Sequence, residues 1–201
     1  MLWMMHQQAP PIRSVAVFCG SRPGHDPAHA AAAGALGTGL AASGIRLVYG
    51  GGKIGLMGVV ADACLAAGGD VIGVIPEFLR AREVAHGQVE QLIVTDSMHS
   101  RKRRMVDMAD AFVVLPGGFG TLDETIEVLT WRQLGLHDKP ILVLESGNWQ
   151  RGLRAALEAS VSDGFAAPET TALLDYLPDV AAVLQRLTTA PAAPATPSAR
   201  L

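Results

Sequence analysis

The sequence has few cysteines, little charge, no basic excess and no long hydrophobic run, and each shortage excludes a class of protein. Only two of the 201 residues are cysteines, Cys19 and Cys64. Both lie in apolar surroundings, which predicts reduced core thiols in a cytosolic protein rather than a disulfide or a metal pair. No cluster of cysteine and histidine has the spacing of a zinc site, so we expect no metal.

The charge balance argues against nucleic-acid and membrane partners. The formal net charge is −3 and the pI is near 6.0, which gives no broad attraction to polyanions or to a membrane surface. No apolar run approaches the length of a membrane span. The first eight residues lack the basic segment and the apolar core of a signal peptide. We therefore expect a cytoplasmic protein that binds neither nucleic acid nor membrane.

What the chain does contain is enough apolar material for one sizeable core. Hydrophobic residues make up 49% of the sequence and charged residues 17%, which is typical of a folded or oligomeric chain rather than a disordered one. We expect a flexible N-terminus at 1–11, a single domain at 12–187, and a disordered Pro/Ala-rich tail at 188–201.

Apolar runs alternate with helical patterns along the whole domain. Strands are predicted at 12–19, 45–49, 71–75, 92–95, 111–115 and 140–144, with a weaker one at 172–174. Helices are predicted at 27–43, 56–67, 98–108, 121–136, 149–163 and 179–187. The stretch 77–88 is charged and irregular, as substrate-side loops often are. The pattern predicts an α/β, Rossmann-like fold: a mostly parallel sheet with helices on both faces.

The most informative stretch is 116–124, Pro-Gly-Gly-Phe-Gly-Thr-Leu-Asp-Glu. It joins an apolar strand to a helix through a glycine-rich turn, and such a helix N-terminus is a ready anion site. Thr121 and Glu124 have the spacing of a capping box, which would begin the helix at Thr121 and place Asp123 and Glu124 in its first turn. We therefore predict a phosphate held beside a carboxylate.

A second glycine-rich turn follows the predicted strand 45–49. Residues 50–55, Gly-Gly-Gly-Lys-Ile-Gly, satisfy the G-x-G-x-x-G pattern. A dinucleotide site also wants an acid at the end of the next strand, and Asp70 and Glu77 are both misplaced for that role. The turn lacks the Lys-Ser/Thr ending of a P-loop as well. A tight structural turn is one reading; we favour a turn that lies against a ribose or a phosphate.

A third stretch, 97–104, opens a helix with four consecutive cations at 101–104. Cations near a helix N-terminus oppose the helix dipole, so such a sequence either solvates them or uses some on an anion. Helical spacing places the stem of Lys102 near the buried side. For Arg103 and Arg104, a solvated basic face and a role in binding an anion both stay open. The isolated histidines, His86, His99 and His137, are read as ordinary surface or core residues.

These three stretches resemble one family. Residues 116–124 resemble its P-G-G-x-G-T-x-x-E signature, residues 98–102 its M-H-x-R-K segment, and residues 50–58 its G-G-G-x-x-G-L-M-G segment. The family is the LONELY GUY type of cytokinin riboside 5′-monophosphate phosphoribohydrolases, often labelled lysine decarboxylases, and the resemblance runs from about Val15 to Leu187. It implies a homodimer without a cofactor that hydrolyses the N-glycosidic bond of adenosine-type 5′-monophosphates to free base (cytokinin) and ribose 5-phosphate.

The resemblance also implies which residues form the site. Arg101 and Glu124 match the proposed catalytic pair of the family. The substrate-binding residues that we expect are Gly51, Gly52, Glu83, Met98, Lys102, Gly117, Gly118, Phe119, Gly120, Thr121 and Asp123. The sequence departs from its relatives at Arg22, where many have a small residue, and at Asp123, where plant members usually have glutamate.

Two other functions are compatible with the same residues. A non-catalytic nucleotide carrier or sensor on this fold would bind through the glycine-rich turns and release no base. A pyridoxal-phosphate lysine decarboxylase would need Lys53 or Lys102 as its Schiff-base lysine. The pairing of Arg101 with Glu124 favours the hydrolase. For the dimer, the sequence support is a helix with apolar residues on more than one side: Ile126, Val128, Leu129, Trp131 and Leu134. Such a helix is expected to be buried on more than one side, either within the subunit or against a second copy.

Overall fold

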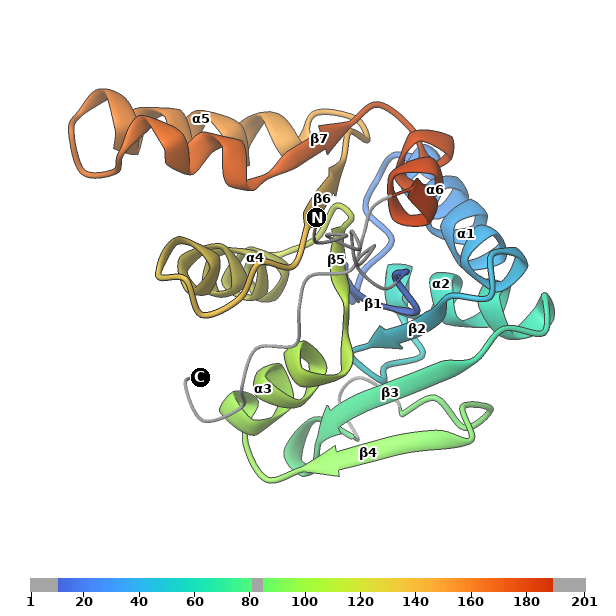
Figure 1. Ribbon diagram of the computed structural model, residues 1–201. Coiled ribbons are helices and arrows are strands. Elements are labelled where there is room, and N and C mark those ends of the chain that lie inside the picture. The colour runs from blue at the N-terminus through green and yellow to red at the C-terminus, as the bar shows by residue number, and fades with distance from the viewer. Residues whose placement is uncertain (1–10, 81–84, 190–201) are drawn as a thin grey trace, which may run out of the picture.

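The computed structural model describes residues 11–80 and 85–189, which form one sheet flanked by helices (Figure 1). Its strands are β1 (Ser14–Phe18), β2 (Arg46–Tyr49), β3 (Val71–Pro76), β4 (Gln91–Thr95), β5 (Ala111–Val114), β6 (Ile141–Leu144) and β7 (Asp175–Leu177). Its helices are α1 (Pro27–Ala42), α2 (Gly55–Ala66), α3 (Met98–Met108), α4 (Phe119–Gln133), α5 (Trp149–Ser162) and α6 (Val180–Thr189). Short 3-10 helices span Glu77–Leu79 and Pro168–Leu173.

The sheet confirms the predicted fold class. Its strand order is β4-β3-β2-β1-β5-β6-β7, and every neighbouring pair is parallel. The chain first builds outward from β1 to β4 and then returns to the other side of β1 with β5. The order therefore reverses between β1 and β5, and in open parallel sheets ligands bind at the carboxyl ends of the strands at such a switch point.

Two apolar layers hold the helices against the sheet. In β1, Val15 and Val17 point into the layer under α1, α2 and α6, whereas Ala16 and Phe18 point into the layer under α3, α4 and α5. The helices are seen on these two sides in Figure 1. Because both faces are covered, every residue of β1 is buried, which explains why the strand reads as a continuous apolar run rather than an alternating one.

Local capping signals start two helices where the sequence predicts. The Asp26 carboxylate accepts a hydrogen bond from the N–H of Ala28 at 2.9 Å and caps α1. Ser97 caps α3 in a reciprocal capping box with Ser100. Within the described residues, no helix combines the length and the apolar character that crossing a membrane would require.

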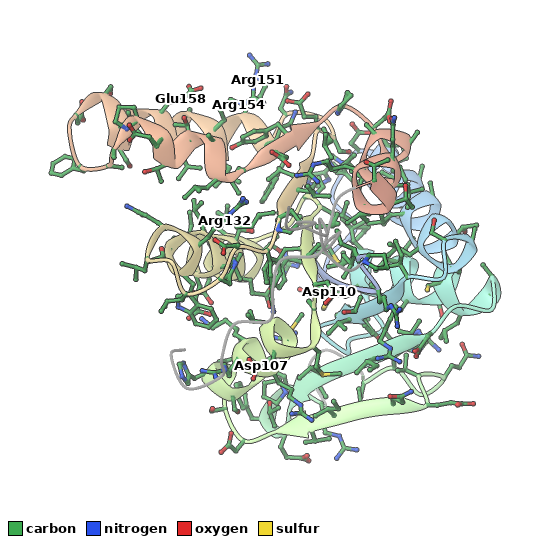
Figure 2. All side chains as sticks on the ribbon, in the orientation of Figure 1. Asp107, Asp110, Arg132, Arg151, Arg154 and Glu158 are labelled. Atoms are coloured by element: carbon green, nitrogen blue, oxygen red, sulfur yellow. The ribbon has the colours of Figure 1, made fainter. Side chains whose placement is uncertain are left out.

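The predicted strand at 172–174 is wrong by three positions. A 3-10 helix, Pro168–Leu173, occupies most of that stretch, and the strand that pairs with β6 is β7. Arg132 on α4, which Figure 2 shows pointing toward α5, donates a hydrogen bond from Nη1 to the carbonyl of Leu173 at 2.8 Å. That carbonyl is therefore engaged outside the sheet. The last helix, α6, ends at Thr189, two residues beyond the end predicted at 187.

Candidate active site

A cavity of about 210 Å³ opens at the switch point of the sheet. Segments that follow β1, β2, β3 and β5 line it, together with side chains of α2, α3 and α4. From these segments come Cys19, Ser21, Gly50, Met57, Leu79, Met98, Arg101, Gly118, Phe119, Gly120, Thr121 and Glu124. We call this space cavity 1. The sheet thus brings the three stretches singled out in the sequence to one place.

The N-terminus of α4 forms one side of cavity 1. The helix begins at Phe119, with Gly118 as an N-cap that has no side chain to accept a hydrogen bond. The predicted start at Thr121 is therefore wrong, and so is the capping box with Glu124. Gly118 takes the N-cap position with an extended backbone, φ −93° and ψ −158°. As a result, Asp123 and Glu124 lie in the second turn, and the first-turn N–H groups have no acceptor within the helix.

The glycines of this turn serve two purposes: one position has no room for a side chain, and two others keep cavity 1 open. A Cβ built on Gly117 would lie 2.0 Å from Oγ1 of Thr121 and 2.9 Å from the nitrogen of Gly20, so the turn itself requires Gly117. A Cβ on Gly118 or Gly120 would meet nothing within 4 Å. Both of these glycines line cavity 1. Their missing side chains leave room beside the N–H groups of α4, which is the space that an anion needs.

The turn is anchored from two sides. The indole Nε1 of Trp149 donates a hydrogen bond to the carbonyl of Gly117 at 2.7 Å. The N–H of Gly20 donates to the carbonyl of Pro116 at 3.0 Å. These bonds tie the residues after β5 to α5 and to the residues after β1. The N-terminus of α4 is therefore positioned by the fold before any ligand arrives.

The other glycine-rich turn, before α2, is closed to an anion. The carbonyl of Gly20 accepts hydrogen bonds from the N–H groups of Leu56 at 3.0 Å and Met57 at 3.4 Å. These N–H groups belong to the first turn of α2, and the bonds use the donors that would bind a phosphate. A Cβ on Gly55 would lie 2.3 Å from the backbone of Ser21, so this turn packs directly against the segment after β1.

Arg101 is a buried cation at the floor of cavity 1. Its side chain is 4% exposed, its Nε donates to the carbonyl of Val74 at 3.1 Å, and its Nη2 donates to the carbonyl of Gly50 at 3.0 Å. A Cβ on Gly50 would lie 2.2 Å from Nη2, so this glycine makes room for the guanidinium. The carbonyls at the ends of β2 and β3 thereby fix the plane of the arginine.

Glu124 faces the same cavity from the opposite helix. It is 7% exposed and lies in α4, whereas Arg101 lies in α3. A carboxylate and a guanidinium from separate helices thus converge beside the N-terminus of α4. Buried ionisable groups that share a pocket are typical of catalytic sites. This geometry can hold an anion and present a carboxylate to the group attached to it.

The sequence of this chain matches known proteins over most of its length. The family described as "Possible lysine decarboxylase" matches residues 57–187. A cytokinin riboside 5′-monophosphate phosphoribohydrolase of Rhodococcoides fascians is 43% identical over 175 residues, which cover 87% of this chain and 88% of that protein. One of Arabidopsis thaliana is 41% identical over 88% of this chain and 83% of its own length. This chain belongs to the cytokinin riboside 5′-monophosphate phosphoribohydrolase family.

Solved structures support the fold of this family member. The molybdenum cofactor carrier protein of Chlamydomonas reinhardtii superposes with a TM-score of 0.65 at 22% identity, over 87% of this chain and 94% of that one. The molybdenum cofactor binding protein of Rippkaea orientalis gives 0.63 at 21% identity, over 88% and 94%. At this level of identity the likeness concerns the fold alone.

Lys102 and Asp123 lie beside cavity 1 rather than in its lining. The Nζ of Lys102 is 3.1 Å from Asp123 and 3.1 Å from Glu127, and these bonds join α3 to α4. Burial alone would lower the pKa of Lys102, but hydrogen bonds and attraction from both carboxylates outweigh it and raise the pKa. A lysine held protonated is a poor Schiff-base nucleophile. Lys53, the other lysine considered for decarboxylation, is exposed.

Gly51 and Gly52, which we expected to bind substrate, lie in the turn after β2 but outside the lining of cavity 1. Gly51 has φ +77°, and a Cβ there would lie 3.1 Å from Ile75 and from Leu92. Gly52 pairs with Ala85 in an isolated antiparallel bridge. Neither lines cavity 1, whereas Gly50 does. Glu83 lies outside the described residues. The substrate contacts assigned to these residues stay predictions.

Sequence reasoning missed several residues that line cavity 1. Ser21 and Gly50 could have been found, because each follows a predicted strand at the ligand-binding edge of the sheet. Met57 and Leu79 carry no such signal, since apolar residues at their positions are equally typical of the core. The three histidines fit their expected roles, as His99 is exposed while His86 and His137 are buried. Among the described residues, no three His, Cys, Asp or Glu side chains could hold a metal ion.

Proposed function

We propose that this protein hydrolyses the N-glycosidic bond of adenosine 5′-monophosphates, including N6-substituted ones, to free base and ribose 5-phosphate. The observation that carries the proposal is the burial of Arg101 and Glu124 in one cavity beside the open N-terminus of α4. Relatives that are 41–43% identical over most of the chain are named for this reaction.

The phosphate is the part of the substrate that the backbone recognises. The first-turn N–H groups of α4 and the space beside Gly118 and Gly120 suit a phosphate dianion. Since the phosphate takes no part in the chemistry, its binding energy serves to align the ribose in cavity 1. The proposal thus includes nucleotide binding at the turn that Gly117–Thr121 form.

Glu124 and Arg101 act on the bond that breaks. As the bond from C1′ to the base nitrogen opens, the bonding electron pair leaves with the base and positive charge builds on the ribose. The Glu124 carboxylate stabilises that charge and takes up a proton from the attacking water, whose oxygen bonds to C1′. That proton then passes to the departing base. Arg101 is a fixed cation that holds the phosphate or polarises the leaving base.

The test is to incubate the purified protein with AMP and with isopentenyladenosine monophosphate and to quantify the free base by chromatography. Release of adenine or of isopentenyladenine, with an equal amount of ribose 5-phosphate, supports the proposal. Binding of both nucleotides without any base release would instead identify a carrier or sensor. A pyridoxal absorbance band in the purified protein would point to the decarboxylase.

We further propose a homodimer that works in the cytoplasm. Ile126 on α4 is 41% exposed and Leu134, the C-cap residue of that helix, is 67% exposed, although Val128 and Leu129 on the same helix are buried. An apolar outer face of this kind suits a second copy of the chain. For the compartment, the support is that Cys19 and Cys64 are buried and do not form a disulfide with each other. Light scattering that gives the mass of a monomer would remove the dimer.

A further inference from the structure

A second and larger cavity lies on the far side of the same glycine-rich turn. Its volume is about 560 Å³, against about 210 Å³ for cavity 1. Its walls come from residues 20–24 after β1, residues 116–119 after β5, and side chains of α1, α2 and α5. We call it cavity 2. The two cavities share Ser21, Gly118 and Phe119, so they meet at the N-terminus of α4.

The position of cavity 2 in the fold suggests what kind of ligand it takes. Cavity 1 is built from segments after β1, β2, β3 and β5, whereas α1 and α5 in place of α3 complete cavity 2. In doubly wound sheets, the two sides of a switch point hold the two halves of a dinucleotide, with the pyrophosphate at a helix N-terminus between them. The proposed mononucleotide substrate would use one side alone.

The walls of cavity 2 suit a flat ring. Trp149 lines it with an indole that is fixed by the hydrogen bond from Nε1 to the carbonyl of Gly117. Phe119 stands at the rim with 91% of its surface exposed. Pro23 and Leu56 add apolar surface. Aromatic faces stack planar heterocycles, and the hydrogen bond of Trp149 already orients its indole for such a contact.

Two polar groups of cavity 2 suit the rest of such a ligand. Arg22 lines this cavity and not cavity 1, next to the shared residue Ser21. It can therefore neutralise a phosphate adjacent to the one held by α4. His29 also lines cavity 2, and its Nδ1 is 2.8 Å from Oγ of Ser146. That bond orients the imidazole and leaves Nε2 as the ring nitrogen available to a ligand hydroxyl.

We infer that cavity 2 is a binding site for the distal half of a pyrophosphate-linked dinucleotide whose adenylate half occupies cavity 1. Arg22 contacts the second phosphate, and Trp149 contacts the ring of the second nucleoside. This inference rests on the proposed function only for the placement of the adenylate. It concerns binding and competition and assigns no second reaction to the site.

The experiment uses NAD⁺ as the dinucleotide probe on the purified full-length chain. Isothermal titration calorimetry measures its binding and that of AMP and ADP, and base release from AMP is followed at rising NAD⁺ concentrations. We expect NAD⁺ to compete with AMP and to bind more tightly than AMP or ADP. NAD⁺ that leaves AMP bound, or that binds no more tightly than ADP, would overturn the inference, because the walls of cavity 2 would then contribute nothing.

Arg22→Ala and Arg46→Ala form a matched pair. Arg46 is the first residue of β2, forms an ion pair with Asp70 and lines neither cavity 1 nor cavity 2. We expect Arg22→Ala to raise the Kd of NAD⁺ about tenfold relative to that of AMP, which is the effect of one charge-assisted phosphate contact. Arg46→Ala should change neither constant. An equal change for both ligands in Arg22→Ala would contradict the site.

The two proposals can fail separately. Base release from AMP without competition by NAD⁺ would overturn the second site and leave the hydrolase standing. Competition between NAD⁺ and AMP in calorimetry, with the dependence on Arg22 but without base release, would support the second site and overturn the hydrolase.

Discussion

Two glycines before and in the first turn of α4 allow the effect of an added methyl group on stability to be separated from its effect on substrate binding. Gly117→Ala places a methyl group 2.0 Å from Oγ1 of Thr121 and 2.9 Å from the nitrogen of Gly20. Overpacking of this kind costs about 1–3 kcal/mol. For a chain of 201 residues, that corresponds to a decrease in Tm of roughly 2–12 °C. The variant is also expected to lose activity, since the turn that holds the phosphate must shift.

Gly120→Ala is the matched change with the opposite effect on stability. Its methyl group would meet nothing within 4 Å, and the residue lies in the first turn of α4. Replacing a helical glycine by alanine stabilises a protein by about 0.4–1 kcal/mol, mainly through the unfolded chain. The methyl group nevertheless enters cavity 1 beside the phosphate position. We therefore expect an unchanged or higher Tm together with a raised KM for AMP.

Differential scanning calorimetry measures Tm, and base-release kinetics measure KM for AMP, for both variants. A Gly120→Ala protein with wild-type KM would refute the placement of the phosphate at α4. A Gly117→Ala protein with wild-type Tm would refute the steric argument for the turn. Gly135→Ala is a useful reference, because that glycine has φ +69° and lies beyond the end of α4, away from both cavities; it should lower Tm without affecting KM.

Three further predictions concern single side chains. Glu124→Gln should fold normally, as judged by circular dichroism, but lose about 10²–10⁴ in kcat for AMP; near-wild-type turnover would exclude Glu124 as the catalytic carboxylate. Trp149→Phe removes the 2.7 Å hydrogen bond to Gly117, worth about 0.5–1.5 kcal/mol net, so KM for AMP should rise roughly 2–12-fold with kcat little changed; a fall in kcat at constant KM would contradict a positioning role. Burial lowers the pKa of His137 to about 4, and its Nδ1 accepts from the N–H of Lys139 while its Nε2 donates to the carbonyl of Val128. Because the unfolded chain takes up this proton first, stability is expected to fall as the pH drops from about 6.5 toward 4; a His137→Gln variant with the same pH dependence of Tm as the wild type would disprove the assignment.

The sequence predicts the sheet well because β1, β3, β5 and β6 are buried along their whole length. Runs such as 111–115 are apolar at every position and lead into glycine-rich turns, so both the strands and the turns after them can be identified. The strand order follows only from which neighbours pair in space, but a parallel α/β pattern already limits where ligands bind. The pairing of Arg101 with Glu124 came from the family resemblance, and the pattern of strands and helices contributed only the edge of the sheet at which the glycine-rich turns meet.

The errors arise where a local pattern competes with packing. Thr121 and Glu124 satisfy a capping box, yet α4 begins at Phe119, and Thr121 packs against Gly117 inside the helix. The ion pair of Lys102 with Asp123 links two helices whose contact depends on the sheet order. The residue pattern within either helix alone does not predict this ion pair. Leu79 is missed for a similar reason, since only the approach of the segment after β3 brings it to cavity 1.

The contrast between the two glycine-rich turns gives a bound nucleotide a direction. The carbonyl of Gly20 occupies the N–H groups at the start of α2, whereas the start of α4 has no such acceptor in its cap. Of these two turns, which look alike in sequence, the one before α4 is therefore the better anion site among the described residues. In the proposed function, the phosphate of the nucleotide would lie at α4 and its sugar toward Arg101 and Glu124. Directionality of this kind would persist even if the side chains that contact the base were exchanged, so the base preference could change in related proteins without any change in the bond that is cleaved.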